Sequence, residues 1–411
     1  MMENNLARNK QAGFYYGYVV VGAVFIIMAI IWGTFATFGV FFESFIKTFG
    51  WTRALTSGAS STRDIFFGVI CILTARLADP FGLRRVISIS GFLLGLGYFF
   101  MSRVQTMWQL YLYFGIIISS GMSSYILMLS IVAKWFERRR GIMTAVSLSG
   151  MGIGTMIVPP ISSSFISAHG WRTSYVIIAV SSFVLIVLAA QFLKNPSYEP
   201  NLVESDDASS SQHEALTNSV DISLQKALGT RQFWILSALY FFFLFPLLAV
   251  VVHVVIHATG LGVSAKNAAN IIAVVGGMSV VGMNGAGGTA DKIGNKHTFI
   301  ICYLLMAVSF VVLLVGTASW PLYFFAALFG LAYGGMQVLF SPMVAELFGL
   351  TSHGVILASA ASVGSFGAAL GPLVSGYIFD LTMNYTWAFL ICLLMTVVSV
   401  LLASLLKPVR T

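Results

Sequence analysis

Trp135-Phe136-Glu137-Arg138-Arg139-Arg140-Gly141 is a short charged connection between two long apolar runs. The run that follows it is rich in glycine: Gly150, Gly152 and Gly154. The second half of the chain repeats this pattern, with the spacing of Gly141, Gly154 and Pro159 returning at Gly354, Gly367 and Pro372. The sequence is therefore expected to consist of two matching halves.

A second motif repeats in the same way. Asp79-Pro80-Phe81-Gly82-Leu83-Arg84-Arg85 returns as Asp291-Lys292-Ile293-Gly294-Asn295-Lys296. An acid, a glycine that permits a positive φ, and one or two bases predict a tight turn between helices. Because salt bridges between helix ends can favour one conformation, we expect a gating role for Asp79, Arg84, Arg85, Asp291 and Lys292.

Composition places the chain in a membrane. Of its 411 residues 58% are hydrophobic and 9% are charged, against about 25% charge in soluble domains. The apolar runs have the length of about 20 residues that a helix needs to cross a bilayer. They predict an all-α membrane protein with twelve transmembrane helices in two pseudo-symmetric six-helix bundles, near 17–41, 55–77, 86–102, 108–132, 142–165, 173–193, 233–257, 268–289, 298–317, 321–344, 355–378 and 386–406.

The basic residues predict the orientation. Lys and Arg concentrate in the loops on one side, which places both termini in the cytoplasm of a multi-pass plasma (inner) membrane protein. This bias accounts for the net charge of +8 without a nucleic-acid partner. Residues 194–230 form the one polar stretch, so we expect bundles at 1–193 and 231–411 with a cytoplasmic linker between them.

The chain resembles the major facilitator superfamily over essentially its whole length, and within it the monocarboxylate porter and oxalate–formate antiporter branch. The resemblance rests on the repeated turns and on five further stretches: Ala133–Gly141, Tyr15–Val20, Thr230–Trp234, Val252–Thr259 and Ala345–Gly349. It implies a cavity lined by helices one, four, seven and ten, with helices two, five, eight and eleven at the interface between the halves. It also implies that Tyr125 and Tyr333 lie in the cavity.

One position departs from that family. Its members usually carry an arginine in helix eight, eight residues before the loop aspartate, where it meets the substrate carboxylate. Met283 occupies that position here, and Asn284 follows it. Asn284 is a candidate for a neutral polar group of the substrate, with a hydrogen bond to another helix as the alternative. The missing arginine weakens the expectation of an anionic substrate.

Arg63 and Asp64 are the full charges well inside a predicted span. Such charges are costly in a bilayer and usually face a cavity or a partner. Arg63 is a candidate carboxylate contact, since a guanidinium can donate two parallel hydrogen bonds, and Asp64 is a candidate proton carrier or counter-ion. Neighbouring residues on a helix point about 100° apart, so we expect that the two do not simply pair. The alternative is that the span starts later and both residues lie in the outer water or bridge helices structurally.

Four further polar residues are candidates. His253 and His257 share a helix face by their i, i+4 spacing, and imidazole titrates near neutral pH, so they could couple protons or bind an anion. For His253 the alternatives are a satisfied structural histidine and a metal ligand, although no acidic or Cys partner is nearby. For His257, close to the outer membrane edge, the alternative is a solvated side chain. Tyr333 and Gln337 share a face of the tenth helix in the same way and could hydrogen-bond the substrate, or only another helix.

The glycines of helices five and eight are expected to be packing surfaces: Gly150, Gly152, Gly154, Gly276, Gly277, Gly282, Gly285, Gly287 and Gly288.

These observations favour a secondary active transporter, because paired membrane halves suit alternating access. Small organic anions, above all monocarboxylates, are the expected substrates, by proton symport or anion exchange. A facilitator for another small polar or amphipathic solute is the alternative. A sensor would need an added soluble domain, and an enzyme would need a cluster of catalytic groups. We expect no cofactor, no metal, and a monomer.

Overall fold

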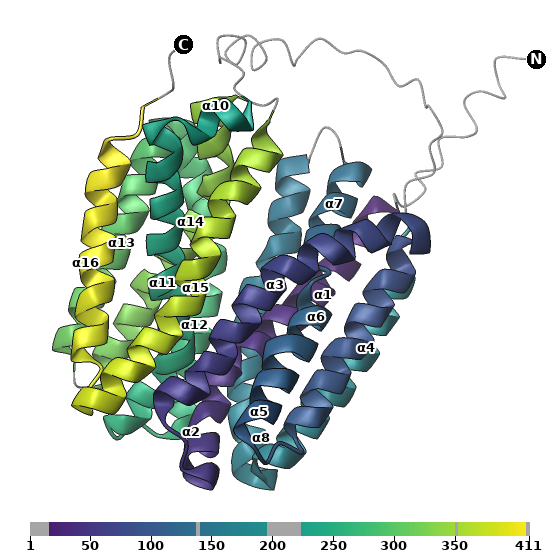
Figure 1. Ribbon diagram of the computed structural model, residues 1–411, viewed down its shortest axis with the longest axis vertical. Helices are drawn as coiled ribbons and strands as arrows, with labels where there is room; N and C mark the ends of the chain where they lie inside the picture. The colour runs from purple at the N-terminus through teal and green to yellow at the C-terminus, as the bar shows by residue number, and fades with distance from the viewer. Residues whose placement is uncertain (1–15, 137–139, 195–222, 317, 350–351, 408–411) are drawn as a thin grey trace, which may run out of the picture.

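Every regular element that the computed structural model describes is a helix (Figure 1). The description covers residues 16–136, 140–194, 223–316, 318–349 and 352–407. The first half contains α1 (Gly17–Ala36), α2 (Phe38–Phe49), α3 (Arg53–Phe81), α4 (Leu83–Met101), α5 (Met107–Leu110), η1 (Tyr111–Ile118), α6 (Ser119–Met122), α7 (Tyr125–Trp135) and α8 (Arg140–Gln191). The second half contains α10 (Leu224–Leu228), α11 (Arg231–Gly260), α12 (Ala265–Ile293), α13 (Asn295–Val315), α14 (Ser319–Phe348), α15 (His353–Thr382) and α16 (Thr386–Ser404).

The helices group into about twelve membrane-spanning segments, which confirms the predicted fold class. α1 and α2 form one segment, α5 through α7 another, and α8 bends at Gly170 (φ 77°) into two. Within the described residues, nine helices are long and apolar enough to cross a membrane. α3 falls outside that set although it has 29 residues, because Arg63 and Asp64 lie at its middle.

The two halves repeat each other in packing as well as in sequence. α1 packs mainly on α8, and α11 packs correspondingly on α15. At both contacts a glycine lets backbones approach: Gly154 lies against the carbonyl of Ala29, and a Cβ at Gly367 would lie 2.5 Å from the carbonyl oxygen of Phe241. Small residues at crossings of membrane helices serve this purpose.

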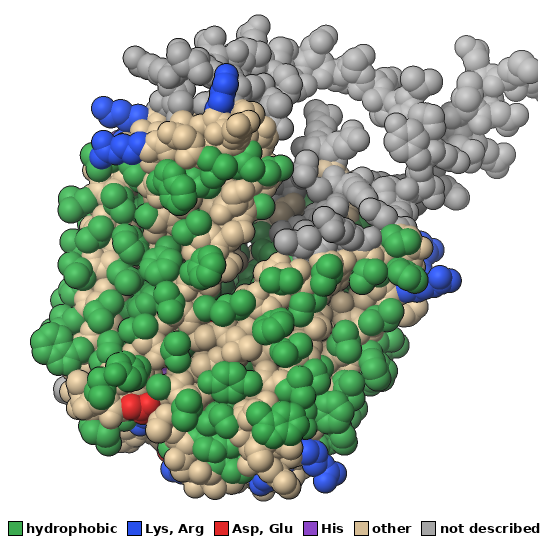
Figure 2. All heavy atoms as spheres, in the orientation of Figure 1, with side chains coloured by type: hydrophobic (Ala, Val, Ile, Leu, Met, Phe, Trp, Pro, Cys, Tyr) green, Lys and Arg blue, Asp and Glu red, His purple; other side chains and the backbone are tan. Residues whose placement is uncertain are grey.

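The halves meet through α3 with α15 and α8 with α12, the interface that the resemblance implied. Gly152 and Gly276 form the second of these contacts, where a Cβ on either would lie 2.7 Å from the other's carbonyl oxygen. The halves also meet at the end where α2 and α15 finish, through α2 with α11 and through the last turn of α15 with the start of α3. We call this the closed end. Toward the opposite end, where α1 begins and α16 finishes, Figure 2 shows a hollow in the surface between the two halves.

The repeated turns are confirmed, and part of the glycine prediction is wrong. Gly82 joins α3 to α4 with φ 81°, and Gly294 joins α12 to α13 with φ 87°. A Cβ at Gly285, Gly287 or Gly288 would meet no atom within 4 Å, so these three do not pack on a neighbour. Most of the predicted linker, residues 195–222, lies outside the described residues.

Candidate substrate-binding site

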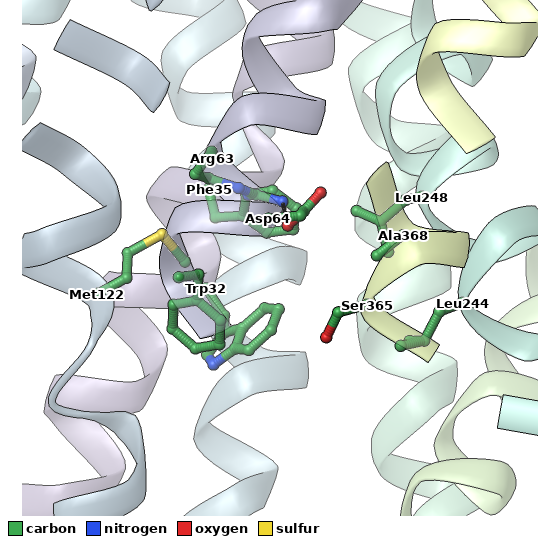
Figure 3. Close-up of a pocket in the computed structure, with 10 residues that line it drawn as sticks. Trp32, Phe35, Arg63, Asp64, Met122, Leu244, Leu248, Ser365 and Ala368 are labelled. Carbon is green, nitrogen blue, oxygen red and sulfur yellow. Dashed lines mark hydrogen bonds and ion pairs between the residues drawn. The ribbon is translucent and has the colours of Figure 1, made fainter. Parts of the chain in front are cut away.

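A cavity of about 120 Å³ lies between the two halves (Figure 3). This volume can hold several water molecules or one small solute. Its wall is formed by α1, α3 and α6 from the first half and by α11 and α15 from the second. The lining residues are Trp32, Phe35, Arg63, Asp64, Phe67, Met122, Leu244, Leu248, Ser365 and Ala368. Helix ten (α14), which the resemblance placed in the cavity, contributes none of them.

Arg63 and Asp64 form an ion pair in this wall, so the expectation that they do not pair is wrong. Their side chains are 3% and 12% exposed. The guanidinium lies over the ring of Phe35, with its Cζ 3.8 Å from the ring centroid. The side chains leave the helix in different directions, but the arginine is long enough to bend back to its neighbour.

The pair leaves hydrogen-bonding capacity unused. Among the described residues, neither Nη1 of Arg63 nor Oδ2 of Asp64 has a hydrogen-bond partner, and Nε1 of Trp32 also has none. Buried polar groups are normally hydrogen-bonded, and each exception calls for an explanation. A small polar ligand in the cavity could accept hydrogen bonds from Arg63 and Trp32 and donate one to Asp64.

The element η1, which packs on α3, is a π-helix that no sequence pattern predicted. Tyr111 at the start of η1 donates from its hydroxyl to the carbonyl of Leu55 over 2.8 Å. Ser119, directly after η1, donates from Oγ to the carbonyl of Arg63 over 3.1 Å. The fourth membrane segment (α5 to α7) is therefore hydrogen-bonded to the backbone of α3 at two points, and one of these is the carbonyl of Arg63. π-helical turns are rare and often lie at functional sites.

The predicted cavity tyrosine of the first half lies next to the cavity lining. The ring of Tyr125 packs edge-on against Trp32, with the centroids 6.0 Å apart, and contacts Phe67 at 6.5 Å. In the second half, the ring of Tyr333 stacks on Phe243 at 6.3 Å. Neither tyrosine lines the cavity itself.

Gln337 reaches across between the halves. Its Nε2 lies 4.0 Å from the Sδ of Met151 on α8, and its buried Oε1 has no hydrogen-bond partner among the described residues. It lies outside the cavity lining, although its unused acceptor keeps it a candidate for contact with a polar solute.

His253 and His257 lie together at the closed end and not in the cavity. His253 is fully buried; its Nδ1 is 2.9 Å from the hydroxyl of Tyr385, and its Nε2 is 2.8 Å from the carbonyl oxygen of Pro372. The ring of His257 packs edge-on against Tyr385 and Phe389. The shared helix face is confirmed, since both rings contact Tyr385.

Met283 and Asn284 lie apart from the cavity. Met283 is 3% exposed, so the position that carries an arginine in the resembled family is closed to a ligand here. Asn284 is exposed and donates from Nδ2 to the carbonyl of Val280, one turn back in α12, over 2.8 Å. This bond is within its own helix, neither to a second helix nor to the cavity wall.

The predicted gating residues lie at the ends of helices. Arg84, Arg85, Asp291 and Lys292 are exposed, and Nε of Arg84 donates to the carbonyl of Leu193 over 3.4 Å. The side chain of Asp79 lies outside the described part of the chain. Within that part, the ion pairs are Glu43 with Lys47 and Arg63 with Asp64.

The residues that sequence reasoning missed are mostly apolar. Trp32, Phe35 and Met122 look like any lipid-facing or core residue in a hydrophobic run. Trp32 alone carried a signal, because an indole N–H in the middle of a span needs a hydrogen-bond acceptor.

Comparison with known proteins covers both halves. Residues 23–295 and 285–411 match the family model of the Major Facilitator Superfamily. Monocarboxylate transporter 12 of Rattus norvegicus is 25% identical over 407 residues, which cover 92% of this chain and 82% of that protein. The uncharacterised MFS-type transporter YhjX of Escherichia coli (strain K12) is 27% identical over 300 residues, covering 69% of this chain and 70% of the relative.

Solved structures agree with the fold. A D-xylose-proton symporter superposes with a TM-score of 0.75 at 17% identity, covering 96% of this chain and 98% of the other. A bacterial homologue of the human lysosomal transporter Spinster gives 0.72 at 14% identity, covering 95% and 97%. With about twelve membrane-spanning helices in two repeating halves and a family match along both of them, the chain belongs to the Major Facilitator Superfamily of secondary transporters.

Proposed function

We propose that this protein transports small monocarboxylates by alternating access, with Arg63 as the anion contact and Asp64 as the proton-carrying group. The observation that carries the proposal is the Arg63–Asp64 pair in a cavity between the halves. Within the described part of the chain, Nη1 of Arg63 and Oδ2 of Asp64 have no hydrogen-bond partner. Monocarboxylate transporters among the relatives support the substrate class.

The pair suggests how a proton and a carboxylate would be coupled. Two carboxylates beside one guanidinium leave a net negative charge in a poorly solvated cavity, which is unfavourable. A proton on Asp64 removes that excess charge. The guanidinium then donates two parallel hydrogen bonds to the substrate carboxylate, and the protonated Asp64 donates a third. One proton would therefore accompany each anion; exchange of one anion for another is the variant that needs no net proton movement.

A neutral or amphipathic solute is the alternative substrate. Two observations favour it: Asp64 already neutralises Arg63, and most of the cavity wall is apolar. Such a solute would use the free groups of Arg63, Asp64 and Trp32 without displacing the ion pair.

Orientation follows from the positive-inside rule. If the ends with Arg84 and Lys292 are cytoplasmic, the hollowed end faces the cytoplasm and the structure is an inward-facing state. We propose that the basic and acidic groups of the two repeated turns pair when this end closes. The chain would divide into bundles 1–193 and 231–411, joined by the linker 194–230.

Thermal unfolding of the purified protein with a panel of small carboxylates tests the binding site, because a ligand for the folded state raises its stability by mass action. Asp64→Asn leaves Arg63 without its counter-ion, so a substrate anion should stabilise this variant more than the parent. Arg63→Met should abolish the shift. Acids that stabilise Arg63→Met as well as they stabilise the parent would exclude Arg63 as the anchor, and a response only to neutral solutes would favour the alternative.

Uptake into proteoliposomes tests the coupling. With an imposed pH gradient the parent should accumulate the acid that gave the largest thermal shift. Asp64→Asn should still exchange labelled for unlabelled acid but should no longer respond to the gradient. A gradient-driven uptake that survives in Asp64→Asn would remove Asp64 from the proton path.

A further inference from the structure

An aspartate of the second half caps a helix of the first half at the closed end. The two carboxylate oxygens of Asp380, in the last turn of α15, accept from the backbone N–H groups of Arg53 and Ala54 over 2.9 and 2.8 Å. These residues begin α3, where N–H groups lack partners within the helix. An anion at a helix N-terminus is stabilised by those free N–H groups and by the helix dipole.

A chain of hydrogen bonds runs beside this cap. Nη1 of Arg53 donates to the hydroxyl of Tyr385 over 2.8 Å. The carbonyl of Pro372 can only accept, so Nε2 of His253 carries the proton and donates to it. Nδ1 of a neutral His253 is then an acceptor, and it receives the hydroxyl proton of Tyr385. The hydroxyl of Tyr385 and both ring nitrogens of His253 therefore have partners, in contrast to the polar groups of the cavity.

The guanidinium of Arg53 is also held by aromatic rings. Its Cζ lies 3.4 Å from the ring centroid of Phe379 and 5.2 Å from that of Tyr385. A guanidinium over an aromatic face is attracted by the ring's electron density. Arg53 thus binds the second half through its backbone, its charge and its hydrogen bonds.

The same two helices connect this network to the cavity. Further along the contact of α3 with α15, Oγ of Ser61 donates to the carbonyl of Ala369. The next residues on both helices, Asp64 on α3 and Ala368 and Ser365 on α15, line the cavity. Opening the closed end requires α3 and α15 to separate, and separation breaks the bonds of Asp380, of Arg53 and of Ser61 together.

We infer that Asp380, Arg53, Tyr385 and His253 form a latch between the halves that holds this end closed, and that His253 serves the latch and not the substrate. The hydrogen bonds of Asp380 and Arg53 join the halves only while this end is closed, so they stabilise that state relative to the one open on this side. The hydrogen bonds of His253 lie within the second half, where they hold the hydroxyl of Tyr385 in place for Arg53. The inference does not depend on which solute is transported.

Thiol labelling tests the latch. Ser57 is fully buried where α3 meets Gly376 of α15, so Ser57→Cys reports separation of the two helices. The reporter is placed in a chain whose three native cysteines are replaced by alanine: Cys71, Cys302 and Cys392. A water-soluble methanethiosulfonate reagent should modify Ser57→Cys slowly in the parent and at least roughly tenfold faster with Asp380→Asn, because hydrogen bonds to a charged group are lost.

Two companion variants make the result decisive. Tyr385→Phe removes one hydroxyl from the chain and should also accelerate labelling, by a smaller factor. Glu43→Gln is the matched control, because it breaks a partly exposed ion pair with Lys47 that lies within α2 at the same end and does not join the halves. Its labelling should equal the parent's. Gel filtration verifies that each variant is folded, and Tyr385→Phe serves alone if Asp380→Asn does not fold.

Unchanged labelling in the folded latch variants would overturn the inference. Equal acceleration by Glu43→Gln would also overturn it, because the end would then be loosened by any lost charge and not by release of α3 from α15.

Discussion

Removing one partner of the Arg63–Asp64 pair should cost more stability than removing both. In Asp64→Asn a guanidinium with 3% of its side chain exposed keeps its charge and loses its counter-ion. Arginine cannot shed its proton in a protein. In Arg63→Met the remaining carboxyl group can take up a proton instead, and its 12% exposure leaves it some access to the cavity. The two single variants are therefore expected to differ, with Asp64→Asn the less stable.

Breaking a buried ion pair from one side costs about 3–5 kcal/mol, whereas replacing both charges is often close to neutral. We expect the upper figure for Asp64→Asn and less than about 3 kcal/mol for Arg63→Met. The double variant should return to within about 2 kcal/mol of the parent, with the remaining loss due to the guanidinium stacked on Phe35. For a domain the size of one half, each kcal/mol corresponds to roughly 2–4 °C in Tm.

The assay is thermal unfolding of the four proteins in one detergent at one scan rate. The double-mutant cycle isolates the interaction between the two side chains. If the losses of the single variants simply add in the double variant, the two charges do not stabilise each other, and the expected coupling is refuted. The double variant should be inactive in uptake even though it is stable, which separates the loss of function from the loss of folding.

Three further outcomes follow from the packing of α12. Gly276→Val should weaken the contact of α12 with α8 and lower Tm, since even a Cβ there would lie 2.7 Å from backbone atoms of α8. Gly285 borders open space, so Gly285→Ala should raise Tm slightly, because alanine is about 1 kcal/mol more favourable than glycine in a helix. Equal changes of Tm in the two variants would contradict this packing. Met283→Arg should lower Tm and restore no anion binding, because the position is 3% exposed. If Met283→Arg, combined with Arg63→Met, showed a thermal shift with carboxylates, this expectation would be refuted. Asn284→Ala should leave uptake unchanged, because its side chain bonds its own helix, and a clear loss of uptake would return Asn284 to the site.

Local chemistry made much of the fold predictable. A run of about 20 apolar residues is sufficient to predict a membrane helix, and the acid–glycine–base motif sufficed for the turns at Gly82 and Gly294, whose φ angles are positive. The interruption of α3 by two charges also directed attention correctly to the cavity wall, because a charge in a membrane helix needs a partner or a cavity. Arg63 and Asp64 do line the cavity.

Contacts between distant segments could not be predicted in this way. The spacing of His253 and His257 established a shared face but not what that face meets, which is Tyr385, more than a hundred positions away in the chain. The position of Gly285 in the sequence likewise does not determine whether it packs on a neighbour or borders open space. The 100° rule described where side chains start but ignored the reach of an arginine, so it missed the pairing of Arg63 with Asp64.

The sequence by itself determined that the protein is helical, lies in a membrane and consists of two related halves, because hydropathy, turn chemistry and repetition are properties of neighbouring residues. Only the tertiary structure decided which polar groups share a cavity and which join the halves. Asp380 and Arg53 are far apart in the chain and become partners because α3 and α15 cross at the closed end. Burial and hydrogen bonding depend on such crossings, since a side chain's energy is set by the atoms around it and not by its place in the chain.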